Sequence, residues 1–133
     1  MKGRYLLDTN LWIALAKGEP GLVTRLRQLD PGQIFSCSVV RAELMSGARK
    51  SQRVEANLTN FQTMLDPFES LPFDDIAAEH YGVIRADLER AGKPIGGNDM
   101  LIAAIARSKD VTLAKRNVGE FSLVAGLRVE AWL

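Results

Sequence analysis

The sequence predicts an α/β fold in which helices cover both faces of a mostly parallel central sheet, giving three α/β/α layers. Short apolar runs typical of buried strands alternate with longer segments whose apolar residues have helical spacing. Parallel strands need long crossover connections of this kind, which usually contain a helix. With 133 residues, 47% hydrophobic and 25% charged, the chain is long enough for one packed domain, expected to span residues 1–133.

The first half of the chain is expected to begin with a buried strand and to continue mainly as helices. The predicted strands cover residues 5–7 and 34–37, and the predicted helices cover residues 11–16, 22–29, 39–48 and 51–65. Asn10 is expected to cap the first helix, because an asparagine side chain accepts hydrogen bonds from the free N–H groups of a first turn. Pro20 suits the start of the second helix, where no N–H partner is needed.

The second half is expected to alternate strands and helices more regularly. The predicted strands cover residues 70–73, 111–114 and 127–132, and the predicted helices cover residues 74–91 and 99–106. Gly92 and Pro94 follow the long helix and are typical of a helix end. Asn98 is expected to cap the last helix, and the alternating pattern of the last strand is typical of a sheet edge.

Three carboxylates stand at the edges of apolar segments. Asp8 follows the first strand, Glu43 interrupts an apolar helix, and Asp99 lies where the longest apolar run begins. A carboxylate held at the edge of a core is costly unless a cation or hydrogen bonds compensate it. Because ligands of parallel sheets bind beyond the carboxyl ends of the strands, these side chains predict a metal site there.

Each carboxylate also has a purely structural interpretation. Asp8 would accept hydrogen bonds from the following turn, and Asp99 would favour the positive end of a helix dipole. Glu43 would be an exposed helical residue paired with Arg41 or Arg49. Three structural acids are not expected to share one strand-end position, so their combination favours a functional site.

The chemistry of the candidate ligands indicates Mg²⁺, with Mn²⁺ as the alternative, because both prefer oxygen ligands. Zinc is not indicated, since Cys37 and His80 are the one cysteine and the one histidine, and His80 is expected to lie away from the acids. A cation held by carboxylates activates water and stabilises charge on a leaving oxygen. The sequence therefore predicts metal-assisted hydrolysis of a phosphodiester.

Composition sets further limits. The net charge of +1 does not indicate nucleic-acid binding over the whole surface, so any basic patch would be local. A single cysteine suits a reducing compartment, and the N-terminal residues lack the apolar core of a signal peptide. The longest apolar run, residues 100–106, is far shorter than the ~20 residues of a membrane helix. A cytoplasmic protein without a membrane partner is expected.

Several short motifs occur in an order that resembles a known family. They are Leu-Leu-Asp-Thr-Asn at 6–10, Ala-Glu-Leu at 42–44, Lys-Pro-Ile-Gly-Gly-Asn-Asp at 93–99, Arg-Asn-Val-Gly-Glu-Phe at 116–121 and Gly-Leu-Arg-Val-Glu-Ala-Trp at 126–132. No single motif is specific, but together they span nearly the full chain. The chain resembles PIN-domain ribonucleases, and in particular the VapC toxins of bacterial toxin–antitoxin pairs.

The resemblance implies a PIN-like fold and a Mg²⁺-dependent endoribonuclease that cuts tRNA or another structured RNA. It implies that Asp8, Glu43 and Asp99 form the acidic metal site and that a fourth polar group follows the fourth strand. Asn117 stands where the family often has Asp, and Glu120 supplies a charge nearby, so both are candidates. The resemblance also implies a homodimer and inhibition by a VapB-type antitoxin.

Lys115 departs from the family pattern, which usually has Thr or Ser at this position. An ammonium group here would neutralise a carboxylate and lower metal occupancy, or would contact a substrate phosphate. Alternatively, it would extend into solvent, as lysine readily does. Thr9 resembles the hydroxyl residue with which the family hydrogen-bonds within the site.

Three other functions compete with this interpretation. A haloacid dehalogenase needs a second Asp where this chain has Asn10, and a receiver domain needs an acidic pair after the first strand. A PIN-like module that binds RNA or protein without cutting is kept open by Lys115. Basic residues that would contact RNA, or simply cover helix faces, are Arg41, Arg49, Lys50, Arg53, Arg85, Arg90 and Lys93.

Overall fold

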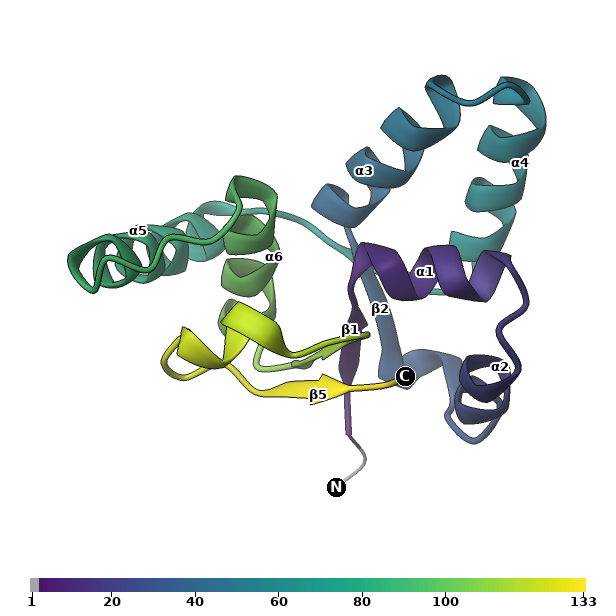
Figure 1. The fold of residues 1–133 in the computed structure, drawn as a ribbon. Coiled ribbons are helices and arrows are strands. Elements are labelled where there is room, and N and C mark those ends of the chain that lie inside the picture. Colours follow the sequence, from purple (N-terminus) through teal and green to yellow (C-terminus); the bar gives the residue numbers. More distant parts are fainter. Residues whose placement is uncertain (1–2) are drawn as a thin grey trace.

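A computed structural model describes residues 3–133 and shows a five-stranded sheet in the order β3-β2-β1-β4-β5 (Figure 1). The strands are β1 (Tyr5–Leu7), β2 (Ile34–Cys37), β3 (Glu69–Leu71), β4 (Thr112–Lys115) and β5 (Val129–Ala131). The helices are α1 (Thr9–Ala16), α2 (Pro20–Arg27), α3 (Ser38–Arg49), α4 (Val54–Leu65), α5 (Asp75–Arg90) and α6 (Gly97–Ser108). Two short 3₁₀ helices, η1 (Pro31–Gln33) and η2 (Gly119–Leu123), complete the described part.

All neighbouring strands pair in parallel, so the predicted α/β class is confirmed. The chain runs from the central β1 outward to β2 and β3, then crosses back through α5 and α6 to β4 on the other side of β1. The strand order therefore reverses at β1. In parallel sheets, the carboxyl edge beside such a reversal is where ligands bind.

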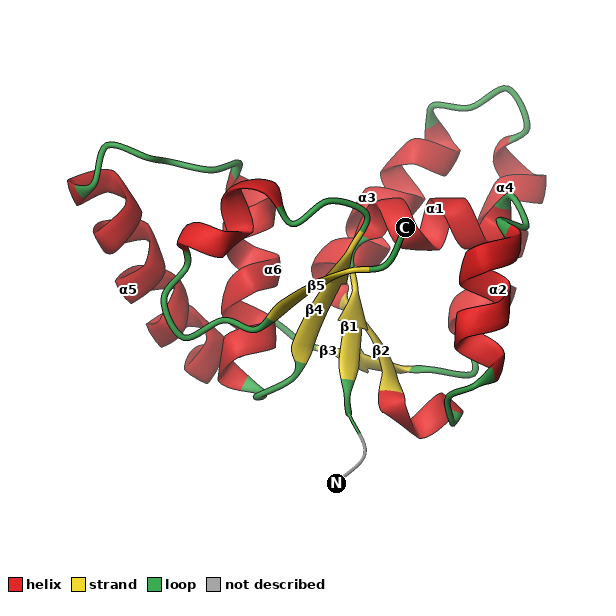
Figure 2. Ribbon diagram, turned by 60° about the horizontal axis from the view of Figure 1, so that its bottom comes forward, coloured by secondary structure: helices red, strands yellow, loops and turns green. Residues whose placement is uncertain are grey.

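The helices form layers on both faces of the sheet (Figure 2). α5 and α6 lie together on one face, while α1 and α2 lie on the other. α3 and α4 form a helical hairpin beside the ends of β1 and β2, where α1 also begins (Figure 1). The centre of the core is apolar because β1 contributes Leu6 and Leu7, the side chains of α1 include the buried Trp12, and α6 buries Ile102 and Ile105.

The structure corrects the predicted caps of two helices. α1 begins at Thr9, and Asp8 rather than Asn10 occupies the N-cap position with extended backbone (φ −67°, ψ 160°). α6 begins at Gly97 with Gly96 as N-cap, so Asn98 lies inside the first turn. Neither cap makes a side-chain hydrogen bond to its helix. The carboxylate of Asp8 is consequently available for other contacts.

Other boundaries differ only slightly from prediction. β3 begins at Glu69 and ends before Pro72, since proline has no N–H for the sheet ladder. α5 begins as predicted, with Asp74 accepting a 2.9 Å hydrogen bond from the N–H of Ala77. The 3₁₀ helices were not predicted, since such short turns have no apolar period. In residues 3–133, no helix is long and apolar enough to cross a membrane.

Candidate active site

Asp8 lies next to Lys115 because β1 and β4 pair side by side. Leu7 is in register with Ala114, and the N–H of Asp8 donates a 3.0 Å hydrogen bond to the carbonyl of Ala114. The following residue of β4 is Lys115, whose Nζ lies 2.8 Å from Oδ2 of Asp8. The two side chains are only 12% and 7% exposed, so this is a buried ion pair.

Lys115 is held from two further directions. Its Nζ lies 4.0 Å from the centre of the Phe121 ring, where the electron-rich face attracts a cation. Its carbonyl accepts a 2.7 Å hydrogen bond from the N–H of Trp132. The interpretation that Lys115 extends into solvent is therefore wrong. The ammonium lies within the acidic site.

Glu43 is placed by α3 and oriented by α1. The hydroxyl of Thr9 donates a 2.7 Å hydrogen bond to Oε1 of Glu43, so the first turn of α1 holds the carboxylate that α3 supplies. The expected role of Thr9 as a hydroxyl within the site agrees with this contact. Arg41 and Arg49 are exposed, and Glu43 contacts Thr9 instead of pairing with either arginine.

Asp99 lies in the first turn of α6, half-buried. Burial raises the pKa of its carboxyl above the ordinary value, the Lys115 ammonium lowers it, and the carboxylates of Asp8, Glu43 and Glu120 raise it again. These charges influence Asp99 because they share one region of the molecule. The acids predicted from three distant segments thus lie in one electrostatic cluster around Asp99.

Gly96 leaves room for that carboxylate. A Cβ atom at this position would lie 3.3 Å from Oδ2 of Asp99, closer than most such contacts. The backbone of the loop before α6 therefore approaches Asp99 because Gly96 lacks a side chain. Gly97, one residue later, has no atom within 4 Å of the corresponding position.

The structure distinguishes Asn117 from Glu120. Oδ1 of Asn117 accepts a 3.0 Å hydrogen bond from the N–H of Gly119, which is a local turn contact at the start of η2. Glu120 lies in the first turn of η2, and its charge is among those that raise the pKa of Asp99. Asn117 is thus engaged in a local turn contact, whereas Glu120 carries a charge near Asp99; which of the two is the fourth site residue stays a prediction.

The donor set fits Mg²⁺ in its chemistry. It consists of carboxylate oxygens, which hard divalent cations prefer. In the described residues, however, no three His, Cys, Asp or Glu side chains already converge as a metal-binding group. Two of the carboxylates already have other partners: Lys115 holds Asp8, and Thr9 holds Glu43. The cluster has the right ligands, but its innermost carboxylate is already compensated by an internal cation.

Cys37 lies close enough to Asp8 and Glu43 to be influenced by their charges, whereas His80 is engaged elsewhere. Burial raises the pKa of Cys37 to about 11, partly opposed by the N–H groups of Val40 and Val39, so the thiol is protonated at neutral pH. His80 accepts a 2.8 Å hydrogen bond at Nδ1 from Nε of Arg107 on the α5–α6 side of the molecule.

An open groove of about 670 Å³ adjoins Glu43 between α3 and α6. Its walls include Ser46 of α3, Lys50 just after the end of α3, and Asn98 from the start of α6. The groove thus offers a cation and several hydrogen-bonding groups beside the acidic cluster. Two other predicted RNA contacts are engaged within α5, where Arg85 pairs with Glu89 and Arg90 pairs with Asp87.

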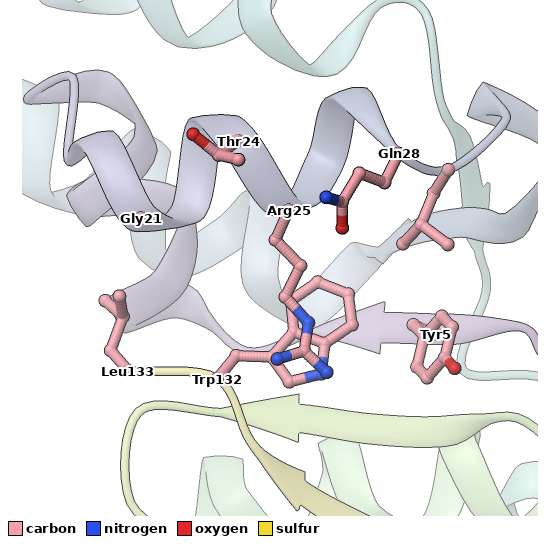
Figure 3. A pocket seen from close by; sticks show the side chains of 8 residues that line it. Tyr5, Gly21, Thr24, Arg25, Gln28, Trp132 and Leu133 are labelled. Carbon is pink, nitrogen blue, oxygen red and sulfur yellow. The ribbon is translucent and has the colours of Figure 1, made fainter.

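A second hollow, of about 390 Å³, lies between α2 and the end of the chain (Figure 3). There the guanidinium of Arg25 lies 4.5 Å from the Trp132 ring centre, and the Tyr5 ring lies 5.0 Å from that of Trp132. Arg25 also pairs with Glu130 at 3.4 Å. This hollow contains none of the clustered carboxylates.

Sequence reasoning did not predict the role of Phe121. It identified Glu120 and the motif around it, but not that the next ring would lie against Lys115. The unusual lysine at position 115 indicated that the site differs here, but it did not indicate that Phe121 would contact the ammonium group. The contact depends on the position of the 3₁₀ helix η2, which contains Phe121 and which the sequence pattern did not predict.

Comparison with known proteins identifies the family. The family model described as the PIN domain matches residues 5–127. The tRNA(fMet)-specific endonuclease VapC of Shigella flexneri is 40% identical over 97% of this chain and 98% of its own length. The chain belongs to the VapC ribonucleases of the PIN-domain family.

Further VapC proteins agree with this assignment. Ribonuclease VapC2 of Haemophilus influenzae is 38% identical over 98% of each chain. The crystal structure of DNA-bound VapBC from Salmonella typhimurium superimposes with a TM-score of 0.92 and 34% identity, covering 99% of this chain and 100% of that chain. As a VapC ribonuclease, the chain is an enzyme that hydrolyses RNA, and the predicted PIN-like fold is confirmed.

Proposed function

We propose that this VapC ribonuclease is a Mg²⁺-dependent endoribonuclease that cuts tRNA, with Mn²⁺ able to replace Mg²⁺. The observation that carries the proposal is the cluster of Asp8, Glu43, Asp99 and Glu120 at the carboxyl edge of the sheet. Such a concentration of negative charge repels the RNA backbone unless a cation compensates it. A relative at 40% identity is named as a tRNA(fMet)-specific endonuclease, which supports tRNA as the substrate class.

Asp99, Glu43 and Glu120 would hold the divalent cation. Asp8, which is more deeply buried, would remain paired with Lys115. When bound, Mg²⁺ supplies a water of lowered pKa and stabilises negative charge on the phosphodiester. The chain supplies orientation: Thr9 fixes one oxygen of Glu43 by its hydrogen bond, and Lys115 fixes one oxygen of Asp8. Because both carboxylates are held before substrate arrives, little reorganisation is needed during the reaction.

The groove between α3 and α6 gives the RNA a path to the carboxylates. Lys50 would pair with a backbone phosphate, while Ser46 and Asn98 would donate hydrogen bonds to phosphate or ribose oxygens. Glu43 lines the same groove, so a strand lying in it passes directly beside the acidic cluster. We expect binding that weakens steeply with salt, as for other phosphate contacts.

The protein would act as the toxin of a toxin–antitoxin pair, with a VapB-type antitoxin as its partner, and would form a homodimer. Support for the antitoxin comes from structural neighbours that are VapBC complexes, including one from Salmonella typhimurium and one from Rickettsia felis. A cytoplasmic location remains our expectation, since RNA targets and a reduced cysteine both suit it.

The test is cleavage of a mixed tRNA pool by purified protein in Mg²⁺, in Mn²⁺ and in EDTA, after any bound antitoxin has been removed under denaturing conditions. The Asp99→Asn variant removes one charge of the cluster without changing side-chain size. Glu79→Gln makes the same chemical change at an exposed position of α5 and serves as the matched control. We expect cutting by the wild type and Glu79→Gln in either metal, and none by Asp99→Asn.

Cutting that persists in EDTA would contradict the metal dependence. Cutting of other RNAs but not of tRNA would contradict the substrate class. The absence of cutting on any RNA by refolded wild type would favour the alternative of a PIN-like binding module.

A further inference from the structure

Lys115 supplies the positive partner of the buried Asp8 carboxylate. Its Nζ lies 2.8 Å from Oδ2 of Asp8. An Asp8 carboxylate that is 7% exposed requires a positive partner. In this chain the partner is a covalently attached ammonium group, and it cannot diffuse away.

The pairing of β1 with β4 places this ammonium group beside Asp8. Asp8 follows β1 and Lys115 ends β4, and the parallel register of those strands places them side by side. The centre of the Phe121 ring lies 4.0 Å from Nζ, and the carbonyl of Lys115 accepts a hydrogen bond from the N–H of Trp132. Displacement of the ammonium by a metal ion would therefore expose a buried charge and break the contact with the ring.

Charge balance leads to the same conclusion. The cluster contains four carboxylates, at Asp8, Glu43, Asp99 and Glu120, and one is neutralised by Lys115. One divalent cation then compensates most of the remaining charge. A second would have to bind next to an ammonium group, and like charges at such distances repel strongly in a partly buried site.

We propose that Lys115 is the permanent second cation of this site, so that the chain binds a single divalent ion among Asp99, Glu43 and Glu120. This inference rests on the proposed metal dependence. It assigns Lys115 a positioning role: the residue holds Asp8 and limits the number of metal ions. Lys115, the last residue of β4, thus sets the number of metal ions that the site binds.

The test is to count bound Mn²⁺ by titration, following the electron paramagnetic resonance signal of the free ion. The variants are Lys115→Met, which keeps a similar length without charge, and Lys109→Met as the matched control. Lys109 also pairs with an aspartate, Asp74, at 2.9 Å, but outside the cluster. We expect one Mn²⁺ per chain for the wild type and Lys109→Met, and two for Lys115→Met.

A further variant, Phe121→Leu, keeps both the lysine and most of the apolar volume at Phe121, which is 4% exposed. It removes the ring face over Nζ, so we expect a second Mn²⁺ to bind at millimolar concentration. If Lys115→Met does not fold, the Mn²⁺ count of Phe121→Leu tests whether Lys115 limits the number of bound ions. One Mn²⁺ in every folded variant, with unchanged affinity, would overturn the role of Lys115.

The metal count separates this inference from the proposed function. Equal binding of Mn²⁺ by all variants, together with metal-dependent cutting of tRNA, would overturn only the role of Lys115. Binding by none of them would overturn both the role of Lys115 and the metal dependence. Two ions in the wild type would overturn the role of Lys115 while leaving the nuclease intact.

Discussion

Two aspartate–lysine pairs of this protein have nearly the same geometry and quite different surroundings. Asp8 and Lys115 lie 2.8 Å apart with side chains 7% and 12% exposed, whereas Asp74 and Lys109 lie 2.9 Å apart with side chains 34% and 30% exposed. The second pair caps α5, where Asp74 also accepts a hydrogen bond from Ala77. The first pair stands at the carboxyl edge of the sheet, within the acidic cluster.

The two pairs show that the distance between the charged atoms does not by itself indicate what an ion pair does. A water-accessible pair loses little when either partner is removed, because solvent replaces the partner. A buried pair leaves an uncompensated charge when one partner is removed. Only the buried pair is therefore able to couple metal binding, stability and catalysis, and the following substitutions test that distinction.

The largest expected effect is on cleavage by the two aspartate variants. Asp8→Asn removes an innermost charge of the site, and we expect tRNA cleavage to fall by about 100-fold or more, the scale of losing one preorganised electrostatic group. Asp74→Asn breaks the other pair and should cleave like the wild type. Initial rates at saturating Mg²⁺ measure both. Equal losses in the two variants would mean that the pairs do not differ in function.

We expect the loss of Lys115 to lower the free energy of unfolding more than the loss of Lys109. Lys115→Met leaves the Asp8 carboxylate buried without its partner, and we expect the free energy of unfolding to fall by about 3 kcal/mol in metal-free buffer. Lys109→Met should cause a much smaller loss, because its partner remains accessible to water. Urea denaturation measures both. Added Mn²⁺ should restore stability to Lys115→Met far more than to the wild type, since binding stabilises the folded state.

The site should also be sensitive to small displacements, unlike the cap of α5. Gly96→Ala places a methyl group 3.3 Å from Oδ2 of Asp99, so the carboxylate has to move by a few tenths of an ångström. We expect cleavage to fall about 10-fold while the melting temperature stays nearly constant. Gly97→Ala, with open space around the added methyl group, is the control and should retain full activity. Identical rates for the two variants would show that the position of Asp99 is not critical.

The smallest effect concerns pH. The N–H of Ala77 and the Lys109 ammonium together hold the pKa of Asp74 below its ordinary value. A lowered pKa in the folded state contributes stability above the usual aspartate pKa and loses it as the pH falls through the lowered value. The stability difference between wild type and Asp74→Asn should therefore shrink below about pH 4. A difference that stays constant from pH 7 to pH 2 would exclude this source of stability.

Much of the architecture was predictable because apolar patterning is local. The buried runs that became β1, β2 and β4, and the long helix α5, follow from their own residues. The caps at Asp8 and Gly96 were not predictable in this way, because the residue before a helix is chosen by backbone angles that the whole fold imposes. For the same reason, Asn10 and Asn98 were wrongly placed as caps.

The sequence indicates candidate site residues but not the contacts between them. Asp8, Glu43 and Asp99 stand out because they are carboxylates at the edges of apolar segments, whereas the different surroundings of Asn117 and Glu120 depend on the 3₁₀ helix η2. The contact of Lys115 with Asp8 depends on strand pairing across the chain, for which no local signal exists. The unusual lysine at position 115 predicts that a carboxylate is neutralised, but not that the carboxylate is the one of Asp8.

The pairing of β1 with β4 also has a consequence for the order of synthesis. Asp8 and Lys115 are 107 positions apart, so a growing chain displays Asp8 long before its cation has been made. Until residues 112–115 emerge, one edge of the central strand β1 has no neighbour. Contacts of such long range form slowly, and an open strand edge invites association with other chains. During synthesis, the pairing of Asp8 with Lys115 would therefore be among the last contacts of the fold to form.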